Sequence, residues 1–309
     1  NMTWDSSNFF KSEADNLSAN YSSVQNKWIE ESSISMGNLL MYKISTSLPQ
    51  TISVAGLKIT PSDENLSVKG NQWNYISYLP AVRLKIYEAL AGYDAKEQDI
   101  IKSQDAFAMY AGNIGWVGSL TYMEPDKGYM IYRNGNDNVT LKYPDSEGTL
   151  KGGIIDMPAG FVSHDYPGNM NMVAVSDIEP RPNDRILAYT GKELISETTI
   201  NYTFFEPAYF ITISGNGDQP LRFELERDGE IIGETKDPYR FNLNAVNGTL
   251  YEPVVLNFRS NDDVLNVYPN PVREELTVTL LTEKSGPVEI QITDITGRKI
   301  LVRKGTGIT

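Results

Sequence analysis

Two segments of the chain, about ninety residues apart, carry similar residues in the same order. The paired positions lie 88 to 91 residues apart: Lys11 with Lys102, Leu17 with Phe107, Tyr21 with Tyr110, Trp28 with Trp116, and Met41 with Met130. Single-residue insertions and deletions would explain the drift in this offset. The period is too long for a solenoid repeat and suits a small tandem domain. We therefore predict tandem modules in which aligned residues have the same structural role.

The second copy includes a front half that has no counterpart in the first. Its opening, "LSVKGNQWNYISY", alternates like a strand. A short helix is then predicted, because apolar residues follow at helical spacing and Gly92 is a plausible stop. Residues 66–145 are thus predicted to be a complete module. Residues 1–60 are predicted to be the C-terminal half of another, whose opening strand and helix lie upstream.

The repeat makes specific structural predictions. Trp28 and Trp116 should each lie largely buried against the sheet of their unit. The pairs Lys11-Ser12 and Lys102-Ser103 should occupy the same point on their strands. The first copy should be the looser of the two unless it leans on the second.

An all-β block is predicted at 168–260, after a linker rich in Gly and Pro at 146–167. Turn residues separate seven candidate strands at the spacing of an antiparallel, immunoglobulin-like sandwich. The strands are "MNMVAVSD", "DRILAYTG", "ELISETTI", "AYFITIS", "LRFELER", "EIIGET" and "PVVLNF". In "LRFELER", Leu221, Phe223 and Leu225 should point into the core, with the charged residues between them pointing out.

Composition narrows the classes of function. The 309 residues carry a formal net charge of −13, and this field repels the phosphate backbone of nucleic acids. The chain has no cysteine, so disulfides, thiolate metal sites and cysteine nucleophiles are excluded. No stretch approaches ~18 uninterrupted apolar residues, so we predict no membrane-spanning segment.

A stiff motif opens the last part of the chain. In Tyr268-Pro269-Asn270-Pro271 both prolines fix their own φ, and Pro271 also pushes Asn270 towards an extended conformation. Alternating strands follow in "ELTVTL", "VEIQITD" and, after a glycine turn, "TGRKILV". Residues 262–309 therefore predict a small, separate β-sandwich.

These last residues closely resemble the C-terminal sorting domain of type IX secretion substrates. The resemblance implies export through the type IX secretion machinery, followed by release or anchoring at the outer-membrane cell surface. We expect this domain to be partial, because residues 262–309 do not include the later strands and last segment that the resemblance implies.

The middle of the chain also resembles known modules. "WNYISYLP", "AFAMYAGNIGWVGSL" and "PDKGYMIY" resemble a tandem module of large bacterial surface proteins. The block at 168–260 resembles the sandwich that often lies between such modules and the sorting domain. The resemblance implies a surface or adhesion segment and supplies no catalytic or ligand-binding residues.

Few residues suggest chemistry. His164 is the single histidine, so a two-histidine metal site is excluded, and we interpret it as a surface-loop residue. The turns "NGNDN", "GNGD" and "NDD" could offer oxygen ligands to calcium, but Asn, Gly and Asp are also what tight turns require. Several aromatic residues could stack on sugars, although strand alternation favours core or half-core positions: Trp73, Tyr75, Tyr78, Trp116, Tyr129 and Tyr132. We predict no catalytic residues, no metal site and no cofactor, with calcium kept as an alternative at one of the turns.

The sequence thus predicts a mainly β chain with a short helix per repeat module, an immunoglobulin-like sandwich and a partial sorting domain. The leading hypothesis is a non-catalytic, exported cell-surface protein that serves in adhesion or in binding a glycan or a host matrix protein. The alternative is the non-catalytic C-terminal tail of a larger secreted hydrolase whose catalytic domain lies upstream.

Overall fold

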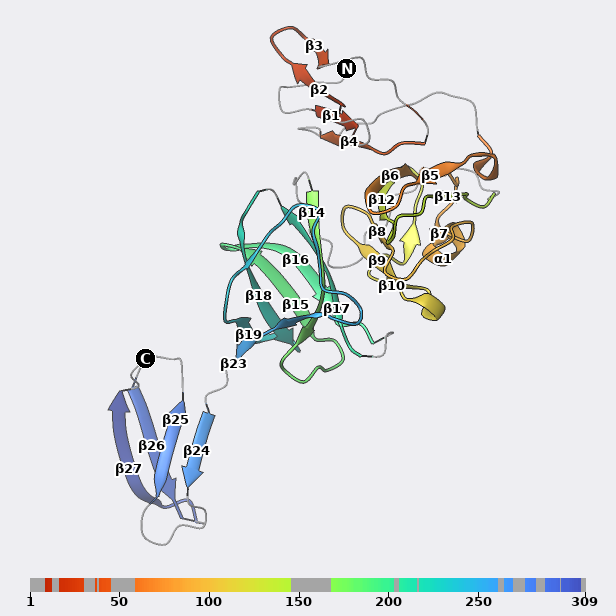
Figure 1. Cartoon of the computed structure of the whole chain (residues 1–309). Helices are drawn as coiled ribbons and strands as arrows, with labels where there is room; N and C mark the ends of the chain where they lie inside the picture. The colour runs from red at the N-terminus through yellow and green to blue at the C-terminus, as the bar shows by residue number, and fades with distance from the viewer. Residues whose placement is uncertain are drawn as a thin grey trace.

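The computed structural model describes residues 9–12, 17–30, 37, 39–45, 59–145, 168–202, 206–215, 217–260, 264–268, 276–281, 287–294 and 296–306. Strands dominate these residues, and they form several separate sheets (Figure 1). The mainly β class predicted from the sequence is confirmed. The predicted linker at 146–167, which contains His164, lies outside the described residues.

The first unit is one antiparallel sheet with the strand order β3-β2-β1-β4. Its strands are β1 (Phe9–Ser12), β2 (Leu17–Ser22), β3 (Lys27–Glu30) and β4 (Tyr42–Ser45). Asn26 closes the tight turn between β2 and β3 at a φ of 53°, a left-handed conformation that asparagine tolerates better than most residues.

The second unit, at 66–145, is built around a five-stranded antiparallel sheet. In spatial order its strands are β10 (Trp116–Gly118), β9 (Phe107–Tyr110), β8 (Ile100–Lys102), β12 (Gly128–Tyr132) and β6 (Trp73–Ser77). Two small pairs join β5 (Leu66–Val68) to β13 (Val139–Leu141) and β7 (Leu84–Lys85) to β11 (Tyr122–Met123). One face of the large sheet covers the core of the unit, to which Ile76, Ile101 and Ile131 contribute.

The predicted opening strand of this unit is in fact two strands. The chain turns between β5 and β6 at Asn71, which has a φ of 52°. The amide of Asn74 holds the turn, because its Oδ1 accepts from the Lys69 N–H and its Nδ2 donates to the Lys69 carbonyl. Local side-chain hydrogen bonds of this kind compete with a continuous strand, so the alternation alone was misleading.

The predicted helix is only one turn long, α1 (Ile86–Ala89), with Leu90 as its C-cap. Gly92 was interpreted as a helix stop, and this was wrong. It forms a β-bridge with Lys142, and a Cβ on Gly92 would lie 2.3 Å from the Lys142 carbonyl oxygen. Glycine is therefore required by a close backbone approach and not by a helix end.

A two-sheet sandwich occupies residues 168–260. One sheet contains β17 (Tyr209–Gly215), β14 (Gly168–Ser176), β21 (Val246–Asn247) and β22 (Val254–Leu256). The other contains β16 (Glu193–Thr199), β15 (Arg185–Thr190), β18 (Pro220–Arg227), β19 (Glu230–Thr235), β20 (Tyr239–Arg240) and β23 (Phe258–Ser260). The seven predicted strands correspond to β14 to β19 and β22.

The alternation predicted for "LRFELER" is confirmed in β18. Leu221, Phe223 and Leu225 are fully buried in the core between the sheets. The prediction of a purely antiparallel sandwich was wrong, because β14 pairs in parallel with both β21 and β22. Turn spacing cannot predict the parallel pairing. That pairing depends on the edge of β14 beside which the returning chain lies.

The C-terminal end consists of two antiparallel strand pairs, which lie apart from the sandwich in Figure 1. β24 (Val264–Tyr268) pairs with β25 (Thr277–Leu281), and β26 (Pro287–Thr293) pairs with β27 (Lys299–Thr306). The three strands predicted after the proline motif are confirmed as β25, β26 and β27. The predicted glycine turn is also present, with Gly297 at a φ of 85°.

Candidate functional site

Each unit places a tyrosine directly opposite a tryptophan on neighbouring strands. Tyr21 of β2 faces Trp28 of β3, with ring centroids 5.6 Å apart and ring planes at 74°. Tyr110 of β9 faces Trp116 of β10, at 5.3 Å and 65°. Both pairs have the edge-to-face geometry that aromatic rings prefer, and such pairs stabilise antiparallel strands.

The strand order is also shared, because β3-β2-β1-β4 corresponds to β10-β9-β8-β12. Lys11 faces Ser18, three residues before the tyrosine of its unit. Lys102 faces Phe107, again three residues before the tyrosine. The two lysines, and the serines that follow them, therefore occupy the same point in the register of their sheets.

The register does not support two of the five matched pairs. Lys102 faces Met130 on β12, whereas Lys11 faces Lys43 on β4, so Met130 corresponds to Lys43 and not to Met41. Phe107 likewise corresponds to Ser18 and not to Leu17. Similar residue types had suggested both pairs, but their members do not occupy equivalent strand positions.

The tryptophans are partly buried. Trp28 and Trp116 both have intermediate exposure, so neither stands in solvent and neither reaches the full burial of a core residue. Trp116 packs against the edge of the core and stacks on Tyr93, with centroids 6.4 Å apart. The reason is position, because β3 and β10 are the outer strands of their sheets among the described residues. The sugar-stacking candidates Trp73, Tyr75, Tyr78, Trp116, Tyr129 and Tyr132 are all buried or half-buried, as the core interpretation predicted.

The first unit contacts the second through residues that precede β4. Met41 is buried, and a Cβ placed on Gly128 would lie only 2.0 Å from its Cγ. The Leu39 side chain packs against the core of the second unit, and its carbonyl accepts a hydrogen bond of 3.5 Å from the Ser77 N–H. The first unit thus packs against the β6–β12 edge of the second.

The second unit and the sandwich share an apolar interface, which we call the junction. The second unit contributes the face of its sheet opposite to its own core, and the sandwich contributes the outer face of β14 and β17. The buried residues are Ile100, Phe107, Met109, Ala111 and Val117 on one side and Val173, Ala208, Phe210 and Leu250 on the other. The ring centroids of Phe107 and Phe210 lie 5.8 Å apart across this interface. At the rim lies a pocket of about 210 Å³, partly lined by Glu206 and Tyr251.

Lys102 lies at the edge of this junction with 1% of its surface exposed. Its Nζ donates to Asn169 Oδ1 at 2.8 Å and to Asn244 Oδ1 at 3.1 Å, and it lies 4.7 Å from the centre of the Trp73 ring. Burial, together with the nearby positive charge of Lys43, lowers the pKa of Lys102 to about 7. The sequence analysis identified Lys102 as a repeat position but not its two asparagine partners. An asparagine gives no sign in the sequence that it will face a distant lysine.

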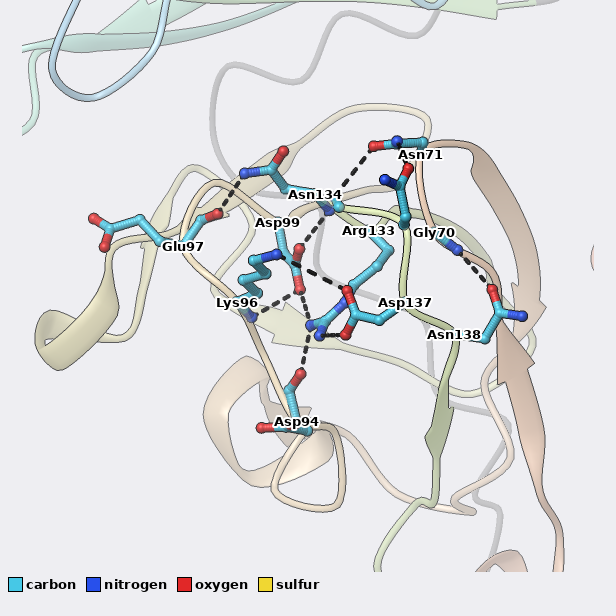
Figure 2. A network of polar contacts seen from close by, with 12 residues as sticks. Gly70, Asn71, Asp94, Lys96, Glu97, Asp99, Arg133, Asn134, Asp137 and Asn138 are labelled. Atoms are coloured by element: carbon cyan, nitrogen blue, oxygen red, sulfur yellow. Dashed lines mark hydrogen bonds and ion pairs between the residues drawn. The ribbon is translucent and has the colours of Figure 1, made fainter.

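A second polar network holds the loops at one end of the second unit (Figure 2). Asp99 is fully buried and accepts four hydrogen bonds. The donors are Tyr93 Oη at 2.8 Å, the Lys96 N–H at 2.9 Å, Arg133 Nη1 at 3.0 Å and the Asn134 N–H at 2.7 Å. The charge of Asp99 is thus balanced by Arg133 and its oxygens are engaged, which defines a structural role.

Arg133 also bears on the alternative of a calcium site at "NGNDN". Arg133 Nη2 donates to Asp137 Oδ2 at 2.5 Å, so the guanidinium lies between the two carboxylates that a cation would use (Figure 2). At "GNGD", Asp218 pairs instead with Arg240. "NDD" at 261–263 lies outside the described residues. Within the part of the chain that the structure describes, no group of three or more candidate metal-binding side chains occurs.

The sorting motif is described only at its first residue. Tyr268 ends β24 and faces Thr277 of β25, whereas Pro269, Asn270 and Pro271 lie outside the described residues. None of the described helices is long and apolar enough to cross a membrane.

The described residues define a β-protein of several separate units, the last of which includes β24 with Tyr268 as its final residue. Residues 266–307 match the family model described as a secretion system C-terminal sorting domain. This match supports a type IX secretion sorting domain, and with it an exported protein that is secreted or attached to the cell surface and that interacts with the type IX machinery. Neither the comparison with curated proteins nor the comparison with solved structures gave a match.

Proposed function

We propose that this chain is a non-catalytic surface scaffold that carries tandem modules for adhesion, by binding a glycan or a matrix protein. The junction is the observation that carries the proposal. It buries large apolar residues from both partners, so that the second unit and the sandwich form one stiff support upstream of the sorting domain. A support of this kind suits a protein that presents binding elements away from the cell surface.

The tandem repeat is part of the proposal. Its support is the shared strand order, the equivalent lysine positions and the two Tyr–Trp pairs. The immunoglobulin-like character of the sandwich is likewise proposed, on its size and its two packed sheets.

The turns that follow the two paired tyrosines are the proposed contact elements. Val24, at the tip of the first hairpin, is 95% exposed, and Ile114, in the corresponding turn of the second unit, is 45% exposed. Each lies in the segment that leads from the tyrosine to the tryptophan of its own unit. An exposed aliphatic side chain beside an aromatic pair provides an amphipathic surface for a partner.

Glycan and matrix-protein arrays probed with this chain test the proposal. We expect binding that falls about tenfold in the double variant Val24→Asp and Ile114→Asp, as for the loss of a moderate interface contact. Val255→Asp is the matched control, because Val255 is 48% exposed on the sandwich. Absence of any bound partner, or equal losses in both variants, would refute the role of the hairpins.

The non-catalytic part of the proposal has its own test. On a broad panel of glycosidase and protease substrates we expect no turnover. Turnover that disappears on replacing a single carboxylate or His164 would show that the chain is an enzyme.

A further inference from the structure

The junction holds a buried lysine without a balancing negative charge. Among the described residues its amine donates to two neutral acceptors, the amide oxygens of Asn169 and Asn244, and lies over the ring face of Trp73. The other charge that faces it is the like charge of Lys43 on β4 of the first unit. Burying a cation among neutral dipoles costs free energy that an exposed lysine does not incur.

The partners of this lysine belong to the other side of the junction. Asn169 begins the first sandwich strand, and Asn244 lies between β20 and β21. Asn169 also donates from Nδ2 to the carbonyl oxygens of Ser103 at 2.9 Å and Gln104 at 2.8 Å. Separating the second unit from the sandwich would therefore break all of these bonds and return Lys102 to water.

From this arrangement we propose that the junction is a proton-sensitive joint: the second unit and the sandwich hold together less tightly when the Lys102 amine is charged. The apolar residues of the junction supply most of the attraction, and the lysine adjusts it. Asn169 and Asn244 act as positioning residues, because they orient the amine in either protonation state.

The direction of the effect follows from linkage. The pKa of Lys102 is about 7 when the joint is closed, whereas an exposed lysine has a pKa of about 10.4. The closed joint therefore binds fewer protons, and closing becomes more favourable as the pH rises between these two values. As the pH falls from 8 to 6, the closing constant should drop about tenfold. Below pH 6 the change should level off, because both states are then protonated.

The absence of cysteine in the chain provides a clean reporter. A single thiol introduced by Ala208→Cys, at a position 5% exposed where the junction borders its rim pocket, should be labelled much faster when the joint opens. Its labelling rate is divided by that of Lys192→Cys, an exposed residue in a turn of the sandwich, which corrects for thiol ionisation. Ala188→Cys, fully buried inside the sandwich, reports global unfolding.

We expect the normalised rate at Ala208→Cys to rise about tenfold from pH 8 to pH 6 and then to level off. The rate at Ala188→Cys, normalised in the same way, should stay unchanged. Adding Lys102→Met should keep the joint closed at both pH values, and adding Lys102→Arg should leave it loose at both, because arginine stays charged.

Two results would overturn the proposal. One is a normalised rate that does not change between pH 8 and pH 6, or that changes equally in the Lys102→Met background. The other is equal exposure of Ala208→Cys and Ala188→Cys, which would mean that the whole sandwich unfolds. Titration of the Lys102 side chain by NMR checks the same joint without the thiols, and a midpoint above about pH 10 would contradict it.

Discussion

At the scale of single residues, the contact between Asp99 and Arg133 is expected to matter most for stability. Both side chains are buried, with exposures of 0% and 3%. Replacing Asp99 by asparagine would leave the buried guanidinium with only the half-exposed Asp137, and would turn an amide NH2 towards groups that now donate to the carboxylate. We predict that Asp99→Asn lowers the free energy of unfolding by about 3–5 kcal/mol, measured by urea denaturation. Asp137→Asn is the control, because Asp137 is 52% exposed and solvent screens its pair with Arg133, so the loss should be clearly smaller. Equal losses would contradict the assigned role of burial.

The half-buried tryptophans lead to a smaller expectation. Trp116→Ala should cost about 2 kcal/mol, below the ~3–5 kcal/mol typical of a fully buried aromatic residue. Trp28→Ala should cost a similar amount if the two Tyr–Trp pairs are equivalent. Thermal unfolding of both variants measures this, and a large effect at one position with none at the other would argue against a repeat.

At the scale of elements, the contact between the first unit and the second can be tested at Gly128. Because Met41 occupies the space that a Cβ would need, Gly128→Ala should push β4 away from the β6–β12 edge. Hydrogen exchange should then speed up in β1 to β4 while β8 and β9 stay protected. Adding Met41→Ala should relieve the clash, so that the double variant loses less than the sum of the single ones. Simple additivity would mean that the two units do not touch there.

The elements also show where sequence reasoning works. Alternation predicted β18 correctly, because a strand with one buried face must place Leu221, Phe223 and Leu225 on the same side. It was wrong for the opening of the second unit, where Asn74 closes a turn inside an apparently continuous strand. It was also wrong about Gly92, because a close approach to Lys142 depends on residues fifty positions away. A local sequence pattern predicts which face of a strand is buried. Turns and close backbone contacts depend on tertiary structure, which such a pattern does not contain.

At the scale of the whole molecule, the sorting domain could be predicted and the junction could not. Tyr268 and the prolines after it form a contiguous motif, so their meaning is visible in the sequence. The junction joins residues near Lys102 to residues near Asn169 and Asn244, and nothing in the sequence pairs a lysine with distant amides. Alternation along its strands does not reveal it either, because the same pattern fits a face packed inside a unit and one packed against a neighbour.

Export is the prediction that concerns the entire chain. A sorting domain acts as a part recognised by the secretion machinery, and it lies apart from the core of the sandwich in Figure 1. Deleting residues 267–309 in the native host should therefore leave the remaining units folded but confined to the periplasm. Cell fractionation with an antibody against the sandwich measures the location, and resistance to proteolysis shows that the retained protein is folded. A truncated protein that still reaches the outside would refute the sorting role, and a degraded one would mean that this end also stabilises the fold.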